Sequence, residues 1–230
     1  MKLASLFSGG KDSTYSIYKA KQMEHDVVCL VTVFPKSPES QLLHFPAVEL
    51  TKLQAKTMKI PQIVSELNSD KTEDELRVLK TLLEKAKEDF HIDGIVHGGI
   101  SSEFQKKCFE NICQENDLKI VTPLWNTYPK EHMNDLISSG FKFILTSVSS
   151  DGLDETWLGK IISISDISRL GELSNKYGFN LNFEGGEAET FVVDCPLYSQ
   201  PIKISKSEKI WDGYRGRFEI EAASLNSNVR

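Results

Sequence analysis

The sequence predicts an α/β fold in which a doubly wound parallel sheet is followed by a smaller C-terminal α+β domain. Strand and helix patterns alternate through the first half of the chain, as in βαβ units with right-handed crossovers. Residues 27–34 are apolar apart from one threonine, as in a strand buried on both faces. The alternation ends at about residue 124, so we expect one domain at 1–124 and a second at 125–230.

Hydrophobic spacing and turn residues place the individual elements. In the first domain we expect strands at 3–7, 27–34, 60–64, 94–97 and 118–121. Helices are predicted between them at 14–23, 46–59, 72–90 and 102–116. Thr72 and Glu75 have the spacing of a capping box at the start of the third helix. In the second domain we expect helices at 130–139 and 164–177, and strands at 141–148, 191–193, 202–205 and 218–222.

The composition excludes several classes of protein. Hydrophobic residues make up 40% and charged residues 26% of the chain, as in globular proteins. No apolar run approaches the roughly 20 residues of a membrane span, and no signal-peptide pattern opens the chain, so we expect a cytoplasmic protein without membrane contact. The net charge of −6 argues against a stable nucleic-acid-binding surface. The four cysteines form no C-x-x-C pair, which indicates reduced thiols.

The segment from Ser8 through Gly9, Gly10, Lys11 and Asp12 to Ser13 lies between the first strand and the first helix. Paired glycines allow a tight turn and close approach of the backbone to an anion. The first N–H groups of the helix have no intrahelical partner and attract phosphate. A carboxylate beside phosphates is repelled unless a cation lies between them, so we interpret Asp12 as a Mg²⁺ ligand. The segment therefore predicts a nucleotide-binding loop, although an ordinary polar turn is the alternative.

A second candidate site is the acidic segment at residues 184–190, EGGEAET. Its three carboxylates repel one another unless they meet a cation or a proton, and its paired glycines favour a closely approaching ligand. On charge alone, a solvated turn before a strand is the favoured interpretation of the segment.

The order of the motifs resembles one family. SGGKDS is similar to the PP-loop of ATP pyrophosphatases. Together with HGGISSEFQ, TPLW, GLDETWLGK and EGGEAETFVVDCPLY, it resembles the diphthine–ammonia ligase family, archaeal type, from about residue 3 to residue 198. The resemblance implies a Rossmann-like (HUP) ATP-binding domain and a C-terminal substrate-binding domain. It also implies ATP-dependent amidation of diphthine on a translation elongation factor, in which the carboxylate is adenylated, pyrophosphate is released and ammonia attacks.

The resemblance also assigns roles to residues. Ser8, Gly9, Gly10 and Ser13 would hold the pyrophosphate end of ATP, Lys11 would neutralise charge, and Asp12 would bind Mg²⁺. Thr32 and Val33 would meet adenine through backbone groups, and Gly98, Gly99 and Ile100 would flank the nucleotide. His44, His97 and Gln105 are further nucleotide contacts, although either histidine fits a capping role as well. Glu184, Glu187 and Glu189 are candidates for an ammonium site or for orienting the substrate. The chain departs from the family at Cys108, where an arginine is expected.

Three other functions fit parts of the sequence. Another PP-loop enzyme that modifies tRNA would need reactive cysteine pairs and a basic extension, which this chain lacks. A ligase that amidates a small metabolite is excluded only by the family resemblance. A nucleotide-binding sensor without turnover would not need Asp12. The expected partners are the elongation factor and free ammonia; the sequence does not fix the oligomeric state, and a homodimer is one hypothesis.

Overall fold

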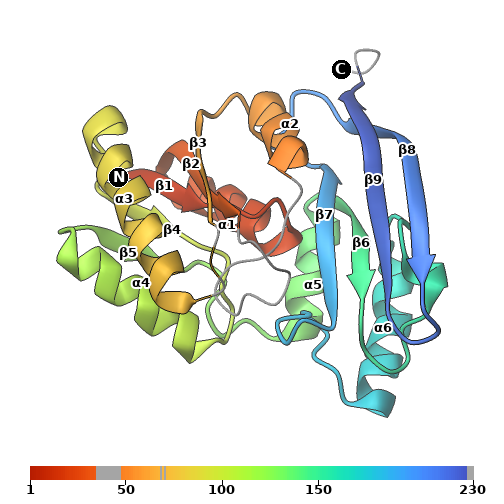
Figure 1. The fold of residues 1–230 in the computed structure, drawn as a ribbon. Coiled ribbons are helices and arrows are strands. Elements are labelled where there is room, and N and C mark those ends of the chain that lie inside the picture. The colour runs from red at the N-terminus through yellow and green to blue at the C-terminus, as the bar shows by residue number, and fades with distance from the viewer. Residues whose placement is uncertain (35–47, 68, 70, 227–230) are drawn as a thin grey trace. The chain divides into compact units, whose positions relative to one another are not determined.

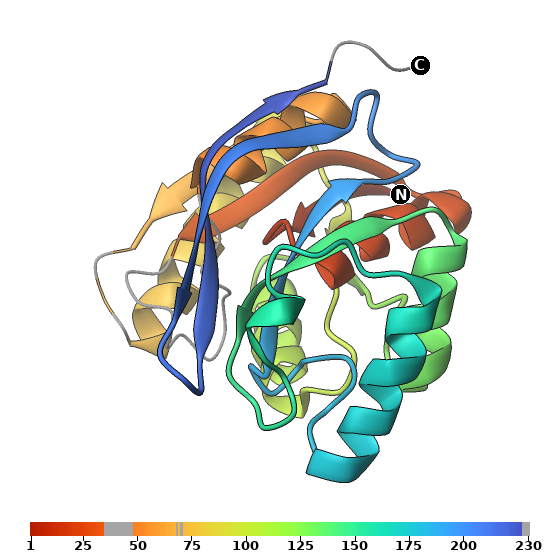
Figure 2. The ribbon, with the colours of Figure 1, turned by 90° about the vertical axis from the view of Figure 1, so that its right-hand side faces the viewer.

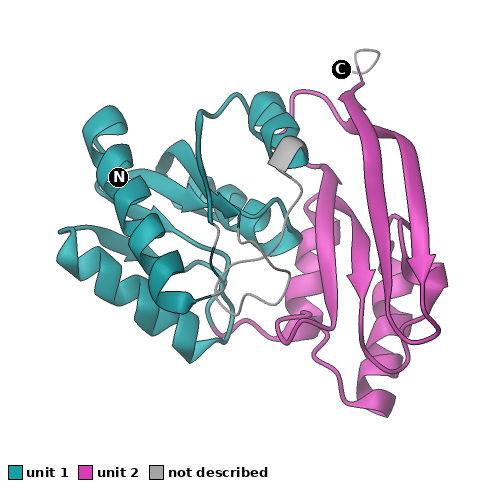
Figure 3. Ribbon diagram, in the orientation of Figure 1, with its two compact units in different colours: residues 1–125 teal, residues 126–230 magenta. Residues whose placement is uncertain are grey.

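The computed structural model describes residues 1–226 except 35–47, 68 and 70, so the predicted contact His44 lies outside the described residues (Figure 1). The chain divides into two compact units, Met1–Trp125 and Asn126–Arg230 (Figure 3). Among the described residues, no helix has both the length and the apolar character needed to cross a membrane.

Unit 1 contains a five-stranded sheet in which every neighbouring pair is parallel. Its strands are β1 (Lys2–Leu6), β2 (Asp26–Phe34), β3 (Gln62–Glu66), β4 (Gly94–Val96) and β5 (Lys119–Val121). The order across the sheet is β3-β2-β1-β4-β5, so the chain reverses its direction of travel between β1 and β4. This arrangement confirms the predicted doubly wound sheet. Ligands of such folds bind beyond the carboxyl ends of the strands at this switch point.

Four long helices connect the strands of unit 1. They are α1 (Lys11–Gln22), α2 (Val48–Met58), α3 (Thr72–Phe90) and α4 (Glu103–Glu115). The helices α3 and α4 cover one face of the sheet, where their apolar residues form a core with Ala4, Cys29 and Val31 (Figure 1). Right-handed crossovers place α1 and α2 on the opposite face.

Two helix starts differ from the predictions. The helix α1 begins at Lys11 rather than at residue 14, so that Asp12 and Ser13 lie in its first turn. The predicted capping box of α3 is wrong, because Lys71 is the N-cap and no side chain caps the helix. Thr72 is the first residue of the helix rather than its N-cap, and Glu75 is only 1% exposed and lies on the same buried face as Leu79.

Unit 2 is an α+β unit, as predicted. Its four-stranded antiparallel sheet has the order β7-β6-β9-β8, and two helices, α5 and α6, pack against each other. The elements are α5 (Pro129–Ser138), β6 (Lys142–Val148), η1 (Glu155–Trp157), α6 (Ile164–Tyr177), β7 (Ala188–Asp194), β8 (Ile202–Trp211) and β9 (Gly216–Leu225). The strands β8 and β9 are much longer than predicted and form the curved hairpin in Figure 2.

Candidate nucleotide site and acidic loop

The predicted phosphate-binding loop joins β1 to α1 at the switch point of the sheet. Gly9 adopts a φ of +83°, a left-handed conformation that glycine reaches without strain. The hydroxyls of Ser8 and Ser13 lie 3.0 Å apart, and the N–H of Gly10 donates to Ser8 Oγ at 3.4 Å. The loop therefore gathers two hydroxyls and a backbone donor next to the N-terminus of α1, which is the set of groups that binds phosphate.

The loop after β4 packs directly on the first turn of α1. A Cβ added to Gly98 would lie 2.5 Å from the carbonyl carbon of Asp12 and 2.6 Å from the nitrogen of Ser13. Only glycine allows this approach without a backbone shift. The structure thus brings together two motifs to which the family resemblance assigns nucleotide contacts, SGGKDS and HGG.

Lys11 and Asp12 form an ion pair at the start of α1. The Nζ of Lys11 lies 2.6 Å from Oδ2 of Asp12, and the two side chains are 2% and 24% exposed. The acidic side chain is thus the accessible member of the pair. An accessible carboxylate beside this loop fits Mg²⁺, which commonly takes one or two carboxylates together with substrate phosphates.

His97 lies at the end of β4 and stabilises the turn that follows. Its Nδ1 accepts a hydrogen bond from the N–H of Gly99 at 3.0 Å, so in the neutral ring Nε2 carries the proton. Burial lowers the pKa of His97 to about 4, which keeps the ring neutral near pH 7. Nε2 is buried and has no hydrogen-bond partner in the described part of the chain. A buried donor of this kind is a group that a bound ligand can satisfy.

The remaining predicted residues on this side of the sheet are placed at the start of α4. Ile100 is buried, with 2% of its side chain exposed. Gln105 lies half-buried in the first turn of α4, and its N–H donates to Oγ of the N-cap residue Ser102 at 3.3 Å. Cys108, the position where the family resemblance leads us to expect an arginine, packs partly buried against the core of unit 1.

Thr32 and Val33 lie where β2 continues beyond its neighbour β1. The ladder between these strands ends at the pair Leu6 and Val31, and the N–H of Phe7 donates to the Val31 carbonyl. Backbone groups alternate in direction along a strand, so Val33 turns its N–H and C=O to the side of β1, past the last ladder pair. The backbone of Thr32 faces β3 instead, and its hydroxyl donates to the Phe7 carbonyl at 2.8 Å.

Two glutamines that the sequence analysis missed support this edge of the sheet. Nε2 of Gln54 donates to the Gly9 carbonyl at 2.8 Å. Nε2 of Gln62 donates to the hydroxyls of Thr32, at 2.9 Å, and Thr51, at 3.1 Å. For Gln54, the sequence offers one signal: polar residues recur every three positions in α2. These residues, Thr51, Gln54 and Thr57, are all fully buried.

The acidic segment of unit 2 is a closed loop that leads into β7. The two carboxylate oxygens of Glu187 accept the N–H groups of Asn180 and Gly185, each at 2.9 Å. Phe183 is buried and has a φ of +62°, a conformation that costs about 1–3 kcal/mol in a residue other than glycine. Its ring stacks on Phe179 with centroids 6.2 Å apart. The segment is therefore an ordered loop, held by internal hydrogen bonds and ring stacking, rather than a solvated turn.

The other two carboxylates of this segment lie on either side of Glu187. Glu184 is half-buried in the loop, and Glu189 is half-buried on β7, with its N–H donating to Ser147 Oγ at 3.1 Å. Among the described residues, no group of three or more His, Cys, Asp or Glu side chains is placed to hold a metal ion. The segment thus offers carboxylates to a ligand without forming a metal centre in the described part of the chain.

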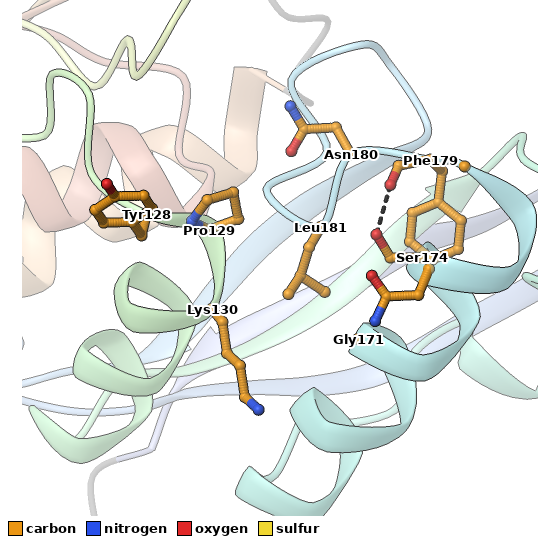
Figure 4. Close-up of a pocket in the computed structure, with 10 residues that line it drawn as sticks. Tyr128, Pro129, Lys130, Gly171, Ser174, Phe179, Asn180 and Leu181 are labelled. Atoms are coloured by element: carbon orange, nitrogen blue, oxygen red, sulfur yellow. Dashed lines mark hydrogen bonds between the residues drawn. The ribbon is translucent and has the colours of Figure 1, made fainter.

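A pocket of about 510 Å³ adjoins the acidic loop (Figure 4). It lies between the start of α5 and the end of α6, and Asn180, whose N–H binds Glu187, forms part of its wall. Its lining is Tyr128, Pro129, Lys130, Gly171, Ser174, Asn175, Gly178, Phe179, Asn180 and Leu181.

A doubly wound sheet with a glycine-rich loop at its switch point defines a Rossmann-like α/β protein. Two family models match the chain, one described as diphthamide synthase N-terminal domain at residues 1–120 and one as diphthamide synthase C-terminal domain at residues 128–225. The chain belongs to the diphthamide synthase family and is an enzyme of the ligase class. These matches confirm the family that the motifs predicted.

Relatives named diphthine–ammonia ligase match over nearly the whole chain. The protein from Danio rerio is 31% identical over 231 residues, which cover 91% of this chain and 89% of that protein. The human protein is 30% identical, with 91% of this chain and 85% of that protein covered. The Schizosaccharomyces pombe protein is 28% identical, and the match spans 37% of its length. A solved chain described as a predicted subunit of tRNA methyltransferase, from Methanocaldococcus jannaschii, has 17% identity and a TM-score of 0.44 and covers 85% of this chain and 97% of its own.

Proposed function

We propose that this protein amidates diphthine on a translation elongation factor with ATP and free ammonia. A carboxylate oxygen of diphthine attacks the α-phosphorus of ATP, and the bond to the bridging oxygen breaks to release pyrophosphate. Ammonia then attacks the carbonyl carbon of the acyl-adenylate. The C–O bond breaks, AMP leaves with the electron pair, and the nitrogen loses a proton to give the amide. Family membership supports the substrate, because relatives are named diphthine–ammonia ligase.

The observation that carries the ATP part is the loop at the switch point. Two hydroxyls, of Ser8 and Ser13, and the N–H of Gly10 lie together beside the start of a twelve-residue helix. Such groups bind the developing charge of a leaving pyrophosphate with little reorganisation. Asp12 would hold Mg²⁺, which would neutralise phosphate charge, and Lys11 would add a positive charge beside it.

The end of β2 supports an adenine site at Val33. The N–H and C=O of Val33 point past the end of β1, and adenine offers a ring-nitrogen acceptor and an amino donor at matching positions. We therefore assign the adenine contact to Val33, with Thr32 holding the strand end in place. Gly98, Gly99, Ile100 and Gln105 would flank the nucleotide, and Nε2 of His97 would donate to it.

Unit 2 is proposed to bind the modified side chain of the elongation factor. The pocket beside the acidic loop has a volume within the usual range for ligand sites. Glu184 and Glu189 would attract ammonium and accept its proton, because a carboxylate favours a nearby cation and can act as a general base. Glu187 would orient this loop through its two backbone contacts. A homodimer and the absence of stable nucleic-acid binding stay predictions.

Product analysis tests the proposal. The protein is incubated with ATP, Mg²⁺, isotope-labelled ammonium and elongation factor that carries diphthine. We expect AMP and pyrophosphate, together with labelled nitrogen in the factor. Formation of ADP, or AMP without label in the factor, contradicts the proposed reaction.

Two variants locate the chemistry in the loop. Asp12→Ala should abolish AMP formation while leaving the protein folded. Asp26→Ala is the matched control, because Asp26 is an exposed carboxylate at the opposite end of β2, and it should keep full activity. Equal losses in both variants would contradict the role of Asp12.

A further inference from the structure

Gln54 of α2 contacts the predicted phosphate-binding loop, residues 8–13, on the side away from the expected ligand. Its side chain is fully buried in α2, although glutamine is rarely buried without a specific partner. Its Nε2 donates to the Gly9 carbonyl at 2.8 Å. The packing is also close, since a Cβ on Gly9 would lie 2.3 Å from Gln54 Oε1.

This contact fixes the direction of the next backbone donor. In a trans peptide the C=O of one residue and the N–H of the next point in opposite directions. Because Gln54 holds the Gly9 carbonyl toward α2, the Gly10 N–H points to the other side of the loop. There it meets Oγ of Ser8 at 3.4 Å, next to the hydroxyl of Ser13.

Gln62 helps to hold Phe7, the residue before the loop, through the hydroxyl of Thr32. Its amide donates to the Thr32 hydroxyl at 2.9 Å, which in turn donates to the Phe7 carbonyl at 2.8 Å. It also donates to Thr51 of α2 at 3.1 Å. The Phe7 carbonyl is thus held by Thr32 of β2, and the Gly9 carbonyl by Gln54 of α2.

We infer that Gln54 is a positioning residue for the phosphate loop. It keeps the Gly10 N–H turned toward the place where nucleotide phosphates bind, without touching the nucleotide itself. The inference rests on the proposed function for the identity of the ligand. It predicts that loss of the Gln54 amide weakens binding of the phosphates and leaves binding of the nucleoside part unchanged.

Calorimetric titration with ATP and with adenosine separates binding of the phosphates from binding of the nucleoside. Gln54→Met keeps the approximate size of the side chain but removes the donor. We expect ATP to bind about tenfold more weakly, as for the loss of one hydrogen bond and the order that it imposes, whereas adenosine binding stays the same. Met58→Leu changes a buried apolar side chain one turn along α2 and should weaken neither ligand. Equal ATP affinity in wild type and Gln54→Met would overturn the inference.

A second variant covers the case in which Gln54→Met unfolds. Gln54→Glu donates to the Gly9 carbonyl when its carboxyl is protonated and cannot when it is ionised. Its ATP affinity should approach that of the wild type at low pH and fall more steeply as the pH rises. A pH profile parallel to that of the wild type would contradict the role of the amide.

Hydrogen exchange distinguishes this inference from the proposed function. Without any nucleotide, the Gly10 amide should exchange faster in Gln54→Met than in the wild type, while amides of β5 remain equally protected. If the wild type binds no ATP, the proposed function fails, but the Gly10 amide still decides the positioning role. Unchanged exchange at Gly10 would refute that role.

Discussion

Gly98 lies directly against Asp12, because a Cβ at position 98 would stand 2.5 Å from the Asp12 carbonyl carbon. Gly98→Ala must therefore push the loop after β4 away from the first turn of α1. We expect a loss of about 1–3 kcal/mol in the free energy of unfolding, as for other overpacked sites, together with weaker ATP binding. Urea denaturation and ATP titration measure the two effects.

The matched control for this prediction is Gly171→Ala. Gly171 lies within α6, where an added Cβ meets no atom within 4 Å. Alanine there should be neutral or should stabilise the protein by about 0.5–1 kcal/mol. Equal stability of the two variants would show that the packing of Gly98 on Asp12 is not tight in solution.

His97 predicts an acid sensitivity of unit 1. Its pKa is lowered to about 4 by burial, below the value of about 6.5 in an unfolded chain. The unfolded state therefore binds the proton more readily, and stability is lost as the pH falls from about 6.5 toward 4. Between pH 7 and pH 5 we expect this residue to cost about 2 kcal/mol in the free energy of unfolding.

Denaturation of wild type and His97→Asn at both pH values tests this expectation. Asparagine can accept the Gly99 N–H in the same turn but does not titrate. The variant should lose about 2 kcal/mol less than the wild type between pH 7 and pH 5. If both proteins lose the same stability, His97 is not the group responsible.

The parts of the fold that follow from local sequence were predicted well. Helix α6 has the predicted bounds, because its apolar spacing and the Gly178 after it are local signals. The hairpin of β8 and β9 was underestimated because its residues are mostly exposed and alternate with lysine and glutamate, so that no apolar run marks it. Its long strands depend on pairing with each other rather than on a buried face.

In the candidate site as well, features of contiguous residues could be predicted, whereas contacts between distant residues could not. The loop geometry of residues 8–13 could be predicted because it depends on contiguous residues, and phosphate binding there stays a prediction. The contact from Gln54 to Gly9 joins residues 45 apart in the chain and could not be predicted from a local pattern. The acidic segment is an intermediate case, since its carboxylates are visible in the sequence, whereas the closed loop held by Glu187 depends on Asn180 and on Ser149 from the end of β6.

The four cysteines should differ sharply in reactivity. Burial raises the pKa of Cys29 and of Cys113 to about 12, so roughly one thiol in ten thousand of this type is ionised at pH 8. Cys195 is fully buried as well, whereas Cys108 is half-buried. We expect one thiol to react with a disulfide reagent in the native protein and four after unfolding. The fast reaction should vanish in Cys108→Ser, and its persistence there would show that another cysteine is accessible.

Substitution of Glu187 by glutamine distinguishes a structural role of this carboxylate from a catalytic one. Its two oxygens accept one backbone N–H each, from Asn180 and Gly185. Glu187→Gln keeps only one acceptor and turns a donor toward the other N–H. We expect unit 2 to lose about 1 kcal/mol of stability, as for a hydrogen bond that is only partly buried, and both amides to exchange faster with solvent. Glu172→Gln, at an exposed position of α6, is the control.

Amide exchange and amidation activity, measured together in Glu187→Gln, show which role Glu187 has. If Glu187 orients the acidic loop, faster exchange at the Asn180 and Gly185 amides accompanies any loss of amidation, and both effects are absent in Glu172→Gln. If instead activity falls while the two amides stay protected, the loss does not come from the loop, and Glu187 handles ammonium directly. The geometry favours the first outcome, since both carboxylate oxygens already accept backbone donors and Glu184 and Glu189 flank the same turn.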